Sequence, residues 1–328
     1  MQILDWFPVR SLPTVNYMQY PGLDKQIRRN NFNSLLLLIA FPVLLLGMFY
    51  IFFFFINNKE VAEANQYSLQ AMPFVLIGVG IWFLIAWAGH SAFIRMATGS
   101  KPLGRVENKR VYNLVENLCI SQGMRMPKVY VIDDDSLNAF ASGINAVSYS
   151  ISLSSGIINK LDDDELEGVI AHELTHIKNR DTRLLIISII FVGIFAFLAE
   201  LAFRSLRFTG SGKRNKDSKG AGAIILIAIV ITAIAYFLSM LLRFGISRRR
   251  EYLADAGSAE MTRKPYALAN ALRKISGDPL IEAVESRDVA QLFIDNPKPS
   301  LHKSASWDNM FATHPPIEKR IELLEQFV

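Results

Sequence analysis

The sequence predicts a mainly α-helical protein, with multi-span membrane helices and a cytosolic α+β domain that contains a small sheet. Of its 328 residues, 51% are hydrophobic and only 20% are charged, whereas charged residues make up about a quarter of soluble domains. The apolar residues are concentrated in up to four long runs, and the stretches between these runs have a nearly ordinary soluble composition. The composition therefore excludes an ordinary soluble enzyme and, because so much of it is apolar, a disordered chain.

Two uncharged runs predict the first membrane helices. Residues 34–56 and 71–94 each supply the roughly 20 apolar residues that a helix needs to cross about 30 Å of hydrocarbon. The first run begins too far from the N-terminus for an ordinary signal peptide, so we expect it to stay attached. We therefore predict two membrane helices that are joined by an external loop over residues 57–70.

The charges that flank these runs predict their orientation. The loop 57–70 has one cation, Lys59, against two carboxylates. Positive residues lie instead at the other ends of both runs: Arg28, Arg29, Arg95, Lys101, Arg105, Lys109 and Arg110. Because cytoplasmic flanks are enriched in Lys and Arg, we expect the segment 1–33 and the chain after residue 95 to lie in the cytosol.

Residues 95–183 have the pattern of a water-soluble fold. Apolar residues at helical spacing predict an amphipathic helix over 106–123. The β-branched and aromatic run 128–132 predicts a strand, and strict apolar–polar alternation predicts another strand over 147–153, with one face buried. The acidic cluster 161–165 suits the N-terminus of a helix, so the segment that follows it is expected to be helical.

That helix carries the sequence His-Glu-Leu-Thr-His at residues 172–176. On a helix, His172 and His176 lie one turn apart on one face, so both imidazoles can reach a single ion. Imidazole nitrogen is a good zinc ligand, and catalytic zinc commonly has three protein ligands and one water. Glu173 can then act as the general base that takes a proton from this water. The alternative is a solvated helical face on which a Glu lies between two His residues.

A third ligand is needed, and the segment 248–256 offers two carboxylates four residues apart. Glu251 can complete a His–His–Glu set, and Asp255, one helical turn later, can accept a hydrogen bond from a ligand imidazole. The alternative is an exposed helix whose carboxylates pair with the three arginines that precede them. The residues alone leave both possibilities open.

Four stretches together resemble the HtpX-like membrane zinc endopeptidases, a family that also includes the CAAX prenyl protease of the endoplasmic reticulum membrane and the mitochondrial Oma protease. They are residues 137–143 (LNAFASG), 169–181 (VIAHELTHIKNRD), 249–256 (RREYLADA) and 311–321 (FATHPPIEKRI). They occur in the family's order, and the resemblance covers the chain from about residue 100 to its end. The first 30 residues depart from the shorter family pattern, and their role is open.

The resemblance implies a zincin-type metalloprotease domain in which one Zn²⁺ is held by His172, His176 and Glu251. It also suggests that Asn138 and His314 lie close to the zinc and help to stabilise the oxyanion of the tetrahedral intermediate. The implied substrates are misfolded or damaged membrane proteins, so the implied role is proteolytic quality control. The implied location is the inner membrane of a bacterial or archaeal cell.

The expected partners are membrane-protein or unfolded polypeptide substrates and the lipid bilayer, and the oligomeric state stays unknown. We expect the strand 147–153 to bind an extended substrate as an added strand, which gives affinity with little sequence selectivity. Two alternatives stay open: a protease of prenylated C-termini, and a silent membrane scaffold with structural zinc. The second is disfavoured because structural zinc sites usually contain Cys, and no Cys lies near the motif.

Two further apolar runs, 184–203 and 221–242, predict a third and a fourth membrane helix. They divide the domain into a first half, 95–183, and a second half, 243–328. An even number of crossings returns Glu251 to the side of the two histidines, as a shared ion requires.

The loop 204–220 between these runs conflicts with that topology. It carries six Lys or Arg residues against one Asp, and the positive-inside rule therefore favours a cytosolic position. We expect one of two arrangements. Either the two runs form a hairpin that enters the membrane only partly or packs within the protein, or they cross fully because the requirement for a shared ion overrides the charge bias. The loop suits anionic lipid head groups better than nucleic acid, because Phe208 is its one aromatic residue.

Overall fold

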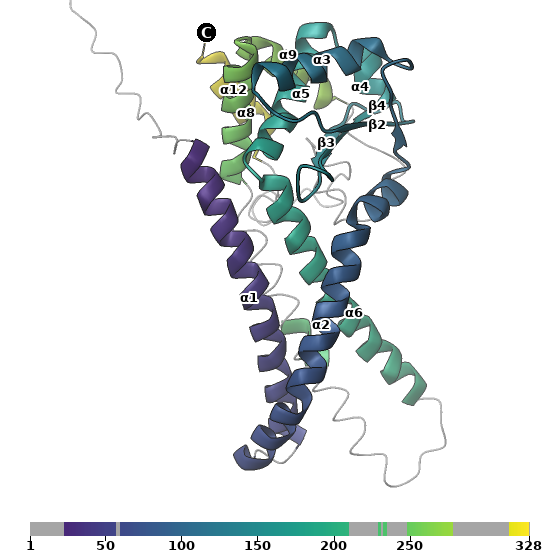
Figure 1. The fold of residues 1–328 in the computed structure, drawn as a ribbon, viewed down its shortest axis with the longest axis vertical. Coiled ribbons are helices and arrows are strands. Elements are labelled where there is room, and N and C mark those ends of the chain that lie inside the picture. Colours follow the sequence, from purple (N-terminus) through teal and green to yellow (C-terminus); the bar gives the residue numbers. More distant parts are fainter. Residues whose placement is uncertain are drawn as a thin grey trace, which may run out of the picture.

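Three long helices extend to one side of a domain that combines a small sheet with shorter helices (Figure 1). This computed structural model describes residues 23–56, 60–209, 229–230, 232–234, 248–277 and 315–327. The long helices are α1 (Leu23–Ile56), α2 (Val61–Thr98) and α6 (Asp181–Thr209). The predicted fold class, mainly α with a small sheet and apolar membrane-type helices, is confirmed.

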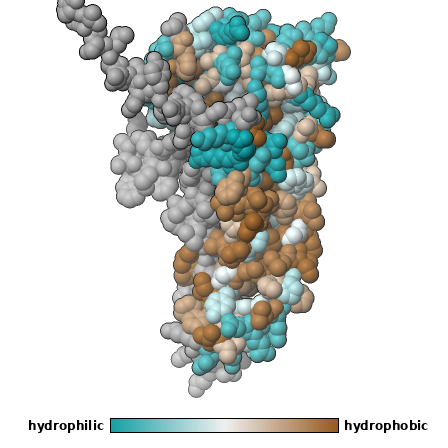
Figure 2. All heavy atoms as spheres, turned by 60° about the vertical axis from the view of Figure 1, so that its left-hand side comes forward, coloured by the Kyte–Doolittle hydropathy of each residue, from teal (hydrophilic) through white to brown (hydrophobic). Residues whose placement is uncertain are grey.

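Helices α1 and α2 expose apolar side chains along much of their length. Both are long and apolar enough to cross a membrane, over Ile27–Phe55 and Val61–Thr98. Only 17% and 6% of the most apolar window of each is buried, and Phe74 is 76% exposed. Figure 2 shows a hydrophobic band between the hydrophilic surface of the domain and a second hydrophilic zone at the opposite end. Such a band is typical of a surface that faces lipid.

Both helices extend beyond the runs that hydropathy picks out. α1 begins at Leu23 instead of residue 34, and α2 begins at Val61, inside the segment 57–70 that the sequence assigns to an external loop. Residues 61–70 combine Glu63 and several amides with good helix formers. Polar side chains end an apolar run, but they do not end a helix.

Helix α6 contains the predicted run 184–203 and contacts both α1 and α2. Its Phe191 stacks on Phe41 of α1, with ring centroids 4.5 Å apart. The Trp82 indole of α2 donates a hydrogen bond to the Ile190 carbonyl, at 3.3 Å. Residues 204–209 continue α6, whereas the rest of the basic loop and most of the run 221–242 lie outside the described residues.

The sheet has four short strands in the order β1-β2-β4-β3. They are β1 (Lys101–Pro102), β2 (Lys128–Ile132), β3 (Ala139–Ser142) and β4 (Ser150–Ser154). β2 and β4 pair in parallel, and the other two pairs are antiparallel. The predicted strand 128–132 matches β2.

The predicted strand 147–153 requires a correction. β4 begins at Ser150, is buried throughout, and lies between β2 and β3, so both of its edges already pair with neighbours. It therefore cannot accept a substrate as an added strand. The alternation is real, but the face that carries serines is covered as well. β3 is the strand at the edge of the sheet next to the catalytic-motif helix.

Six shorter helices complete the described domain: α3 (Lys109–Ser121), α4 (Ser155–Lys160), α5 (Asp163–Lys178), α8 (Arg248–Thr262), α9 (Pro265–Ile275) and α12 (Ile317–Glu325). α5 begins with a capping box, in which Asp162 and Glu165 bond to each other's backbone N–H groups. Its apolar face packs on β3 and β4, and Val169 and Ile151 are fully buried in the shared core.

Two glycines let α5 approach the helices of the second half of the domain. A Cβ atom on Gly257 of α8 would lie 2.5 Å from the Thr175 side chain, and one on Gly168 of α5 would lie 3.1 Å from the Leu268 backbone nitrogen of α9. The Ser258 hydroxyl also donates a hydrogen bond to the Gly168 carbonyl, at 2.7 Å. This close packing brings α8 and its carboxylates alongside the motif on α5.

Candidate metal centre

Helix α5 places the two histidines of the motif side by side. His172 and His176 lie one turn apart, and their Nε2 atoms are 3.2 Å from each other. Glu251 approaches from α8, with one carboxylate oxygen 3.6 Å from the Nε2 of His172 and the other 3.6 Å from the Nε2 of His176. The candidate ligand atoms of the three residues all lie within 4.8 Å of one another. The structure thus brings together all three residues that the sequence proposed as metal ligands.

The spacing and chemistry of these donors fit a zinc ion. Zn–N bonds of about 2.0–2.1 Å at tetrahedral angles place two nitrogen ligands about 3.3 Å apart. Two imidazoles and one carboxylate are typical of a catalytic zinc site with a fourth position for water, whereas a structural site closes all four positions, usually with Cys. The chain's one cysteine, Cys119, is buried in the apolar core on α3 and is not part of the metal group.

Glu173 lies between the two ligands in sequence and is 1% exposed. Neither of its carboxyl oxygens has a hydrogen-bond partner among the residues that the structure describes. Burial raises the pKa of this carboxyl, while His172, His176 and the nearby N–H group of Ala141 act in the opposite direction. The Ala141 N–H group is near but outside full hydrogen-bond geometry. A buried carboxyl group without a well-placed donor is costly, so the position of Glu173 fits a site in which a water supplies the missing hydrogen bond.

The first histidine is held by a carboxylate and an arginine. The Nδ1 of His172 lies 3.0 Å from the Oδ1 of Asp255, the partner that the sequence proposed. Arg320 of α12 binds both oxygens of Asp255, through Nε at 2.9 Å and Nη2 at 2.7 Å. Burial alone would raise the pKa of Asp255, but the Arg320 guanidinium and the His172 ring hold it below its usual range.

The same contacts act on His172 itself. Burial favours its neutral ring, but hydrogen bonds to Asp255 and Glu251 outweigh burial and raise the pKa of His172 to about 9. Because an imidazole binds a metal only when it is neutral, a metal ion must displace this proton.

The second histidine has a carboxylate partner of its own. The Nδ1 of His176 lies 3.0 Å from the Oδ2 of Asp181, at the start of α6. The amide of Asn30, on α1, donates a hydrogen bond to the other oxygen of Asp181, at 2.6 Å. A carboxylate that binds the outer nitrogen of a ligand imidazole fixes the orientation of the ring and its tautomer.

The sequence did not assign a role to Asp181, Arg320 or Asn30. Asp181 and Arg320 lie inside stretches that carry the family resemblance, and Asp181 follows the motif by one short turn, so both could have been considered. Asn30 has no comparable signal, because nothing in its neighbourhood in sequence indicates a contact 151 residues away.

Of the two candidate oxyanion donors, Asn138 and His314, the structure describes only Asn138. Asn138 is fully buried just before β3, where its side-chain oxygen accepts a hydrogen bond from the Ala139 N–H at 2.9 Å. His314 lies outside the described residues. The oxyanion role of both stays a prediction.

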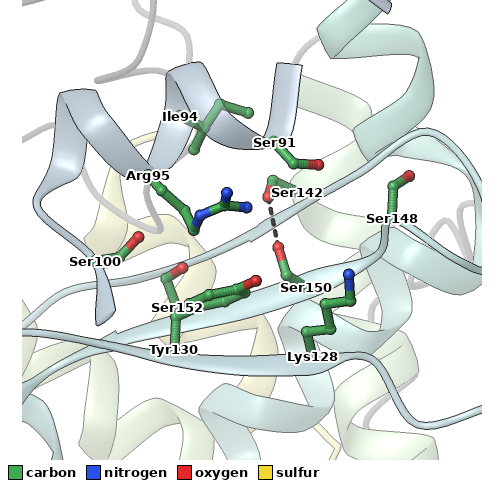
Figure 3. Close-up of a pocket in the computed structure, with 10 residues that line it drawn as sticks. All are labelled: Ser91, Ile94, Arg95, Ser100, Lys128, Tyr130, Ser142, Ser148, Ser150 and Ser152. Carbon is green, nitrogen blue, oxygen red and sulfur yellow. Dashed lines mark hydrogen bonds between the residues drawn. The ribbon is translucent and has the colours of Figure 1, made fainter. Parts of the chain in front are cut away.

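A separate polar pocket lies on the opposite face of the sheet from α5 (Figure 3). The end of α2 forms one wall, and the Arg95 guanidinium lies 5.7 Å from the centroid of the Tyr130 ring on β2. Across the pocket, the hydroxyls of Ser142 and Ser150 lie 2.8 Å apart and share a hydrogen bond. The pocket contains no member of the metal group, and its contacts attach a membrane-type helix to the sheet.

Comparison with known proteins places this geometry in a family. Residues 105–328 match the family model "Peptidase family M48". A protease HtpX homologue of Bacteroides fragilis (strain YCH46) is 55% identical over 322 residues, which cover 94% of this chain and 100% of that protein. A protease HtpX homologue of Ligilactobacillus salivarius (strain UCC118) is 33% identical over 307 residues, covering 92% and 99%.

Among solved structures, the crystal structure of S. mikatae Ste24p matches with a TM-score of 0.45 and 20% sequence identity. That match covers 92% of this chain and 66% of the Ste24p chain. The family match contains the whole candidate metal group. The family model matches most of the chain, and the two relatives align along nearly their full length. This chain therefore belongs to peptidase family M48 and is a membrane metalloprotease.

Proposed function

We propose that this protein is a zinc-dependent endopeptidase that hydrolyses peptide bonds of misfolded or damaged membrane proteins. The observation that carries the proposal is the convergence of His172, His176 and Glu251 beside a buried Glu173 whose carboxyl oxygens have no partner among the described residues. His172, His176 and Glu251 would hold the ion. When bound, zinc lowers the pKa of a coordinated water toward neutrality and polarises the scissile carbonyl.

The remaining chemistry belongs to the side chains of this chain. Glu173 takes a proton from the attacking water and delivers it to the leaving amine, a role for which a buried carboxyl with a raised pKa is suited. Asn138 and His314 are proposed to donate hydrogen bonds to the oxyanion of the tetrahedral intermediate.

The substrate is proposed to bind along β3. The Ser154 N–H donates to the Asn138 carbonyl at 3.0 Å, so the backbone groups of Asn138 face β4. In an antiparallel ladder such residues alternate, and the N–H and C=O groups of Ala141, three positions later, therefore point to the outer edge of the sheet. An extended peptide can pair with these groups next to Glu173. Peptides with methylated backbone nitrogens should be cleaved more slowly than unmodified ones; equal rates would contradict this binding mode.

The proposed setting is a multi-pass protein whose active site faces the cytoplasm. Two helices of membrane type and the basic residues at their domain-side ends support it, among them Arg28 and Arg95. Cysteines introduced into residues 61–70 and 105–110 should be labelled by impermeant reagents from opposite sides of the membrane. Labelling from the same side would contradict the topology.

The function is tested with detergent-purified protein and its Glu173→Gln variant. We expect the variant to bind zinc as wild type does and to cleave casein at least about 100-fold more slowly, because a general base contributes roughly 10²–10⁴. Glu167→Gln is the matched control on the same helix, since the Glu167 carboxylate lies away from the metal group and bonds Lys264, at 3.3 Å, among the described residues.

Three results would decide against the proposal or narrow it. Equal cleavage by wild type and Glu173→Gln would remove Glu173 from the mechanism. Zinc binding without any cleavage would favour a silent scaffold. Cleavage of a farnesylated C-terminal peptide, with casein left intact, would favour a protease of prenylated C-termini.

A further inference from the structure

We propose that Asn30 on the membrane helix α1 is a positioning residue for the metal site, so that zinc binding depends on the docking of α1. This inference rests on the proposed zinc site. Asn30 lies in the first turns of α1, before the apolar run 34–56, in the part of the chain whose role the sequence left open. It is only 1% exposed, although its neighbours in sequence are polar and it lies at the edge of a membrane-type helix.

The contacts of Asn30 lead to the metal site through one intermediate residue. Its Nδ2 atom donates to the Asp181 Oδ1 at 2.6 Å and to the Asn179 carbonyl at 2.8 Å. The Oδ2 of the same Asp181 carboxylate lies 3.0 Å from the Nδ1 of His176. The two oxygens of Asp181 are therefore divided between the membrane helix and a candidate zinc ligand.

The segment that Asn30 holds is a short and strained turn. Only Asn179 and Arg180 separate α5 from α6. Arg180 has a φ of 61°, a left-handed conformation that is unfavourable for residues other than glycine and persists only when the surroundings hold it. The Arg180 side chain donates to the Asn31 Oδ1 at 2.9 Å, so two successive asparagines of α1 bind the turn.

The chemistry of Asn30 favours positioning of Asp181 over simple packing. A small apolar residue would be sufficient for docking two apolar helices, and a buried amide is costly unless its polar atoms are bonded. Both amide hydrogens of Asn30 are directed at the α5–α6 turn. By fixing the Asp181 carboxylate, Asn30 keeps the proton of His176 on Nδ1 and leaves its Nε2 available to the metal.

The test measures zinc affinity by competition with a chromophoric chelator, together with the visible spectrum of the Co²⁺-substituted full-length protein. We expect Asn30→Ala to weaken zinc binding by about 10-fold to 100-fold, as the loss of outer partners of ligand imidazoles does. The isosteric Asn30→Asp should weaken binding further, because it places a second carboxylate against Asp181. Both variants should change the Co²⁺ spectrum and keep the helical content of the metal-free protein. Its melting temperature should fall, because the Asp181 carboxylate and the Asn179 carbonyl lose their hydrogen bonds to Asn30.

Asn31→Ala is the matched control, since Asn31 contacts Arg180 and not Asp181. It should bind zinc within about twofold of wild type, as a variant that leaves the imidazole partners intact should. Zinc affinities of Asn30→Ala and Asn30→Asp equal to wild type would overturn the inference, and so would failure of both to fold while Asn31→Ala folds, because that would assign Asn30 to docking alone. Absence of zinc binding in wild type would instead refute the proposed function.

Discussion

The two halves of the metal site are built alike but draw on different parts of the molecule. In the first half, His172 is held by Asp255, and Asp255 by Arg320. In the second half, His176 is held by Asp181, and Asp181 by Asn30. All members of the first half lie within the protease domain, and its outermost member is the buried cation Arg320. The outermost member of the second half is the neutral amide of Asn30, on a membrane-type helix.

The outer residues of the two halves differ in charge as well as in location: Arg320 is a cation, and Asn30 is neutral. Removal of one partner from a buried ion pair leaves an uncompensated charge and is strongly destabilising. Loss of the neutral donor Asn30 leaves hydrogen bonds to Asp181 and to the Asn179 carbonyl unmade but no unpaired buried charge, which costs less. The first half of the site is therefore expected to support the fold, and the second half chiefly to adjust the metal ligand.

The largest expected effect follows from removal of the buried cation. Arg320→Leu should destabilise the metal-free protein by roughly 3–5 kcal/mol, because the Asp255 carboxylate loses both of its guanidinium bonds while it stays buried. Chemical denaturation of the detergent-purified protein measures this. Lys319→Ala, next to it on α12, removes only an exposed ion pair with Glu322 and should cost no more than about 1 kcal/mol. Similar losses for the two variants would refute the assigned role of Arg320.

A smaller effect is expected when each carboxylate is neutralised. Asp255→Asn and Asp181→Asn should each weaken zinc binding by about 10-fold to 100-fold. Asp255→Asn should in addition lower the melting temperature of the metal-free protein more than Asp181→Asn does, because it leaves the Arg320 charge buried without its carboxylate. Equal melting temperatures for the two variants would contradict the contrast between the two halves.

The last contrast is a dependence on pH that belongs to the first half. The pKa of His172 is raised to about 9, above the value of about 6.5 for an unfolded chain. Its protonation therefore stabilises the metal-free fold fully below about pH 6.5, and this stabilisation is lost as the pH rises through about 9. The melting temperature of the metal-free protein should fall over this interval.

Zinc affinity should change in the opposite sense. Because the ion displaces the proton of His172, affinity should rise with pH by about tenfold per unit in the same interval. Asp255→Asn should flatten both dependences, whereas Asp181→Asn should leave them in place. A wild-type melting temperature that does not change between these pH values would contradict the account of His172.

The local parts of the site were accessible from the sequence, and the long-range parts were not. His172, Glu173 and His176 lie on one helix, where spacing determines which side chains share a face. Glu251 needed the family resemblance, because helix packing through Gly168 and Gly257 brings α8 to α5. Strand β2 was predicted at its observed bounds, but the pairing of β4 on both edges depends on partners that alternation within one strand does not specify.

The helices show the same limit. Hydropathy identified the apolar centres of α1 and α2, yet their polar first turns continue the helix. The contact of Asn30 with Asp181 joins the first turns of α1 and α6, which are 151 residues apart in the sequence, and no local pattern in either segment indicates it.

The turn between α5 and α6 has a mechanical consequence. The helix that carries both histidines and a helix that packs among the membrane-type helices meet at a joint of two residues, Asn179 and Arg180. Apolar helices adjust to bilayer thickness by tilting. If α6 tilts, it pivots at this joint. The residue directly after the joint is Asp181, which contacts His176. In the proposed topology, the thickness of the surrounding bilayer would therefore act on the metal site, alongside pH and metal concentration.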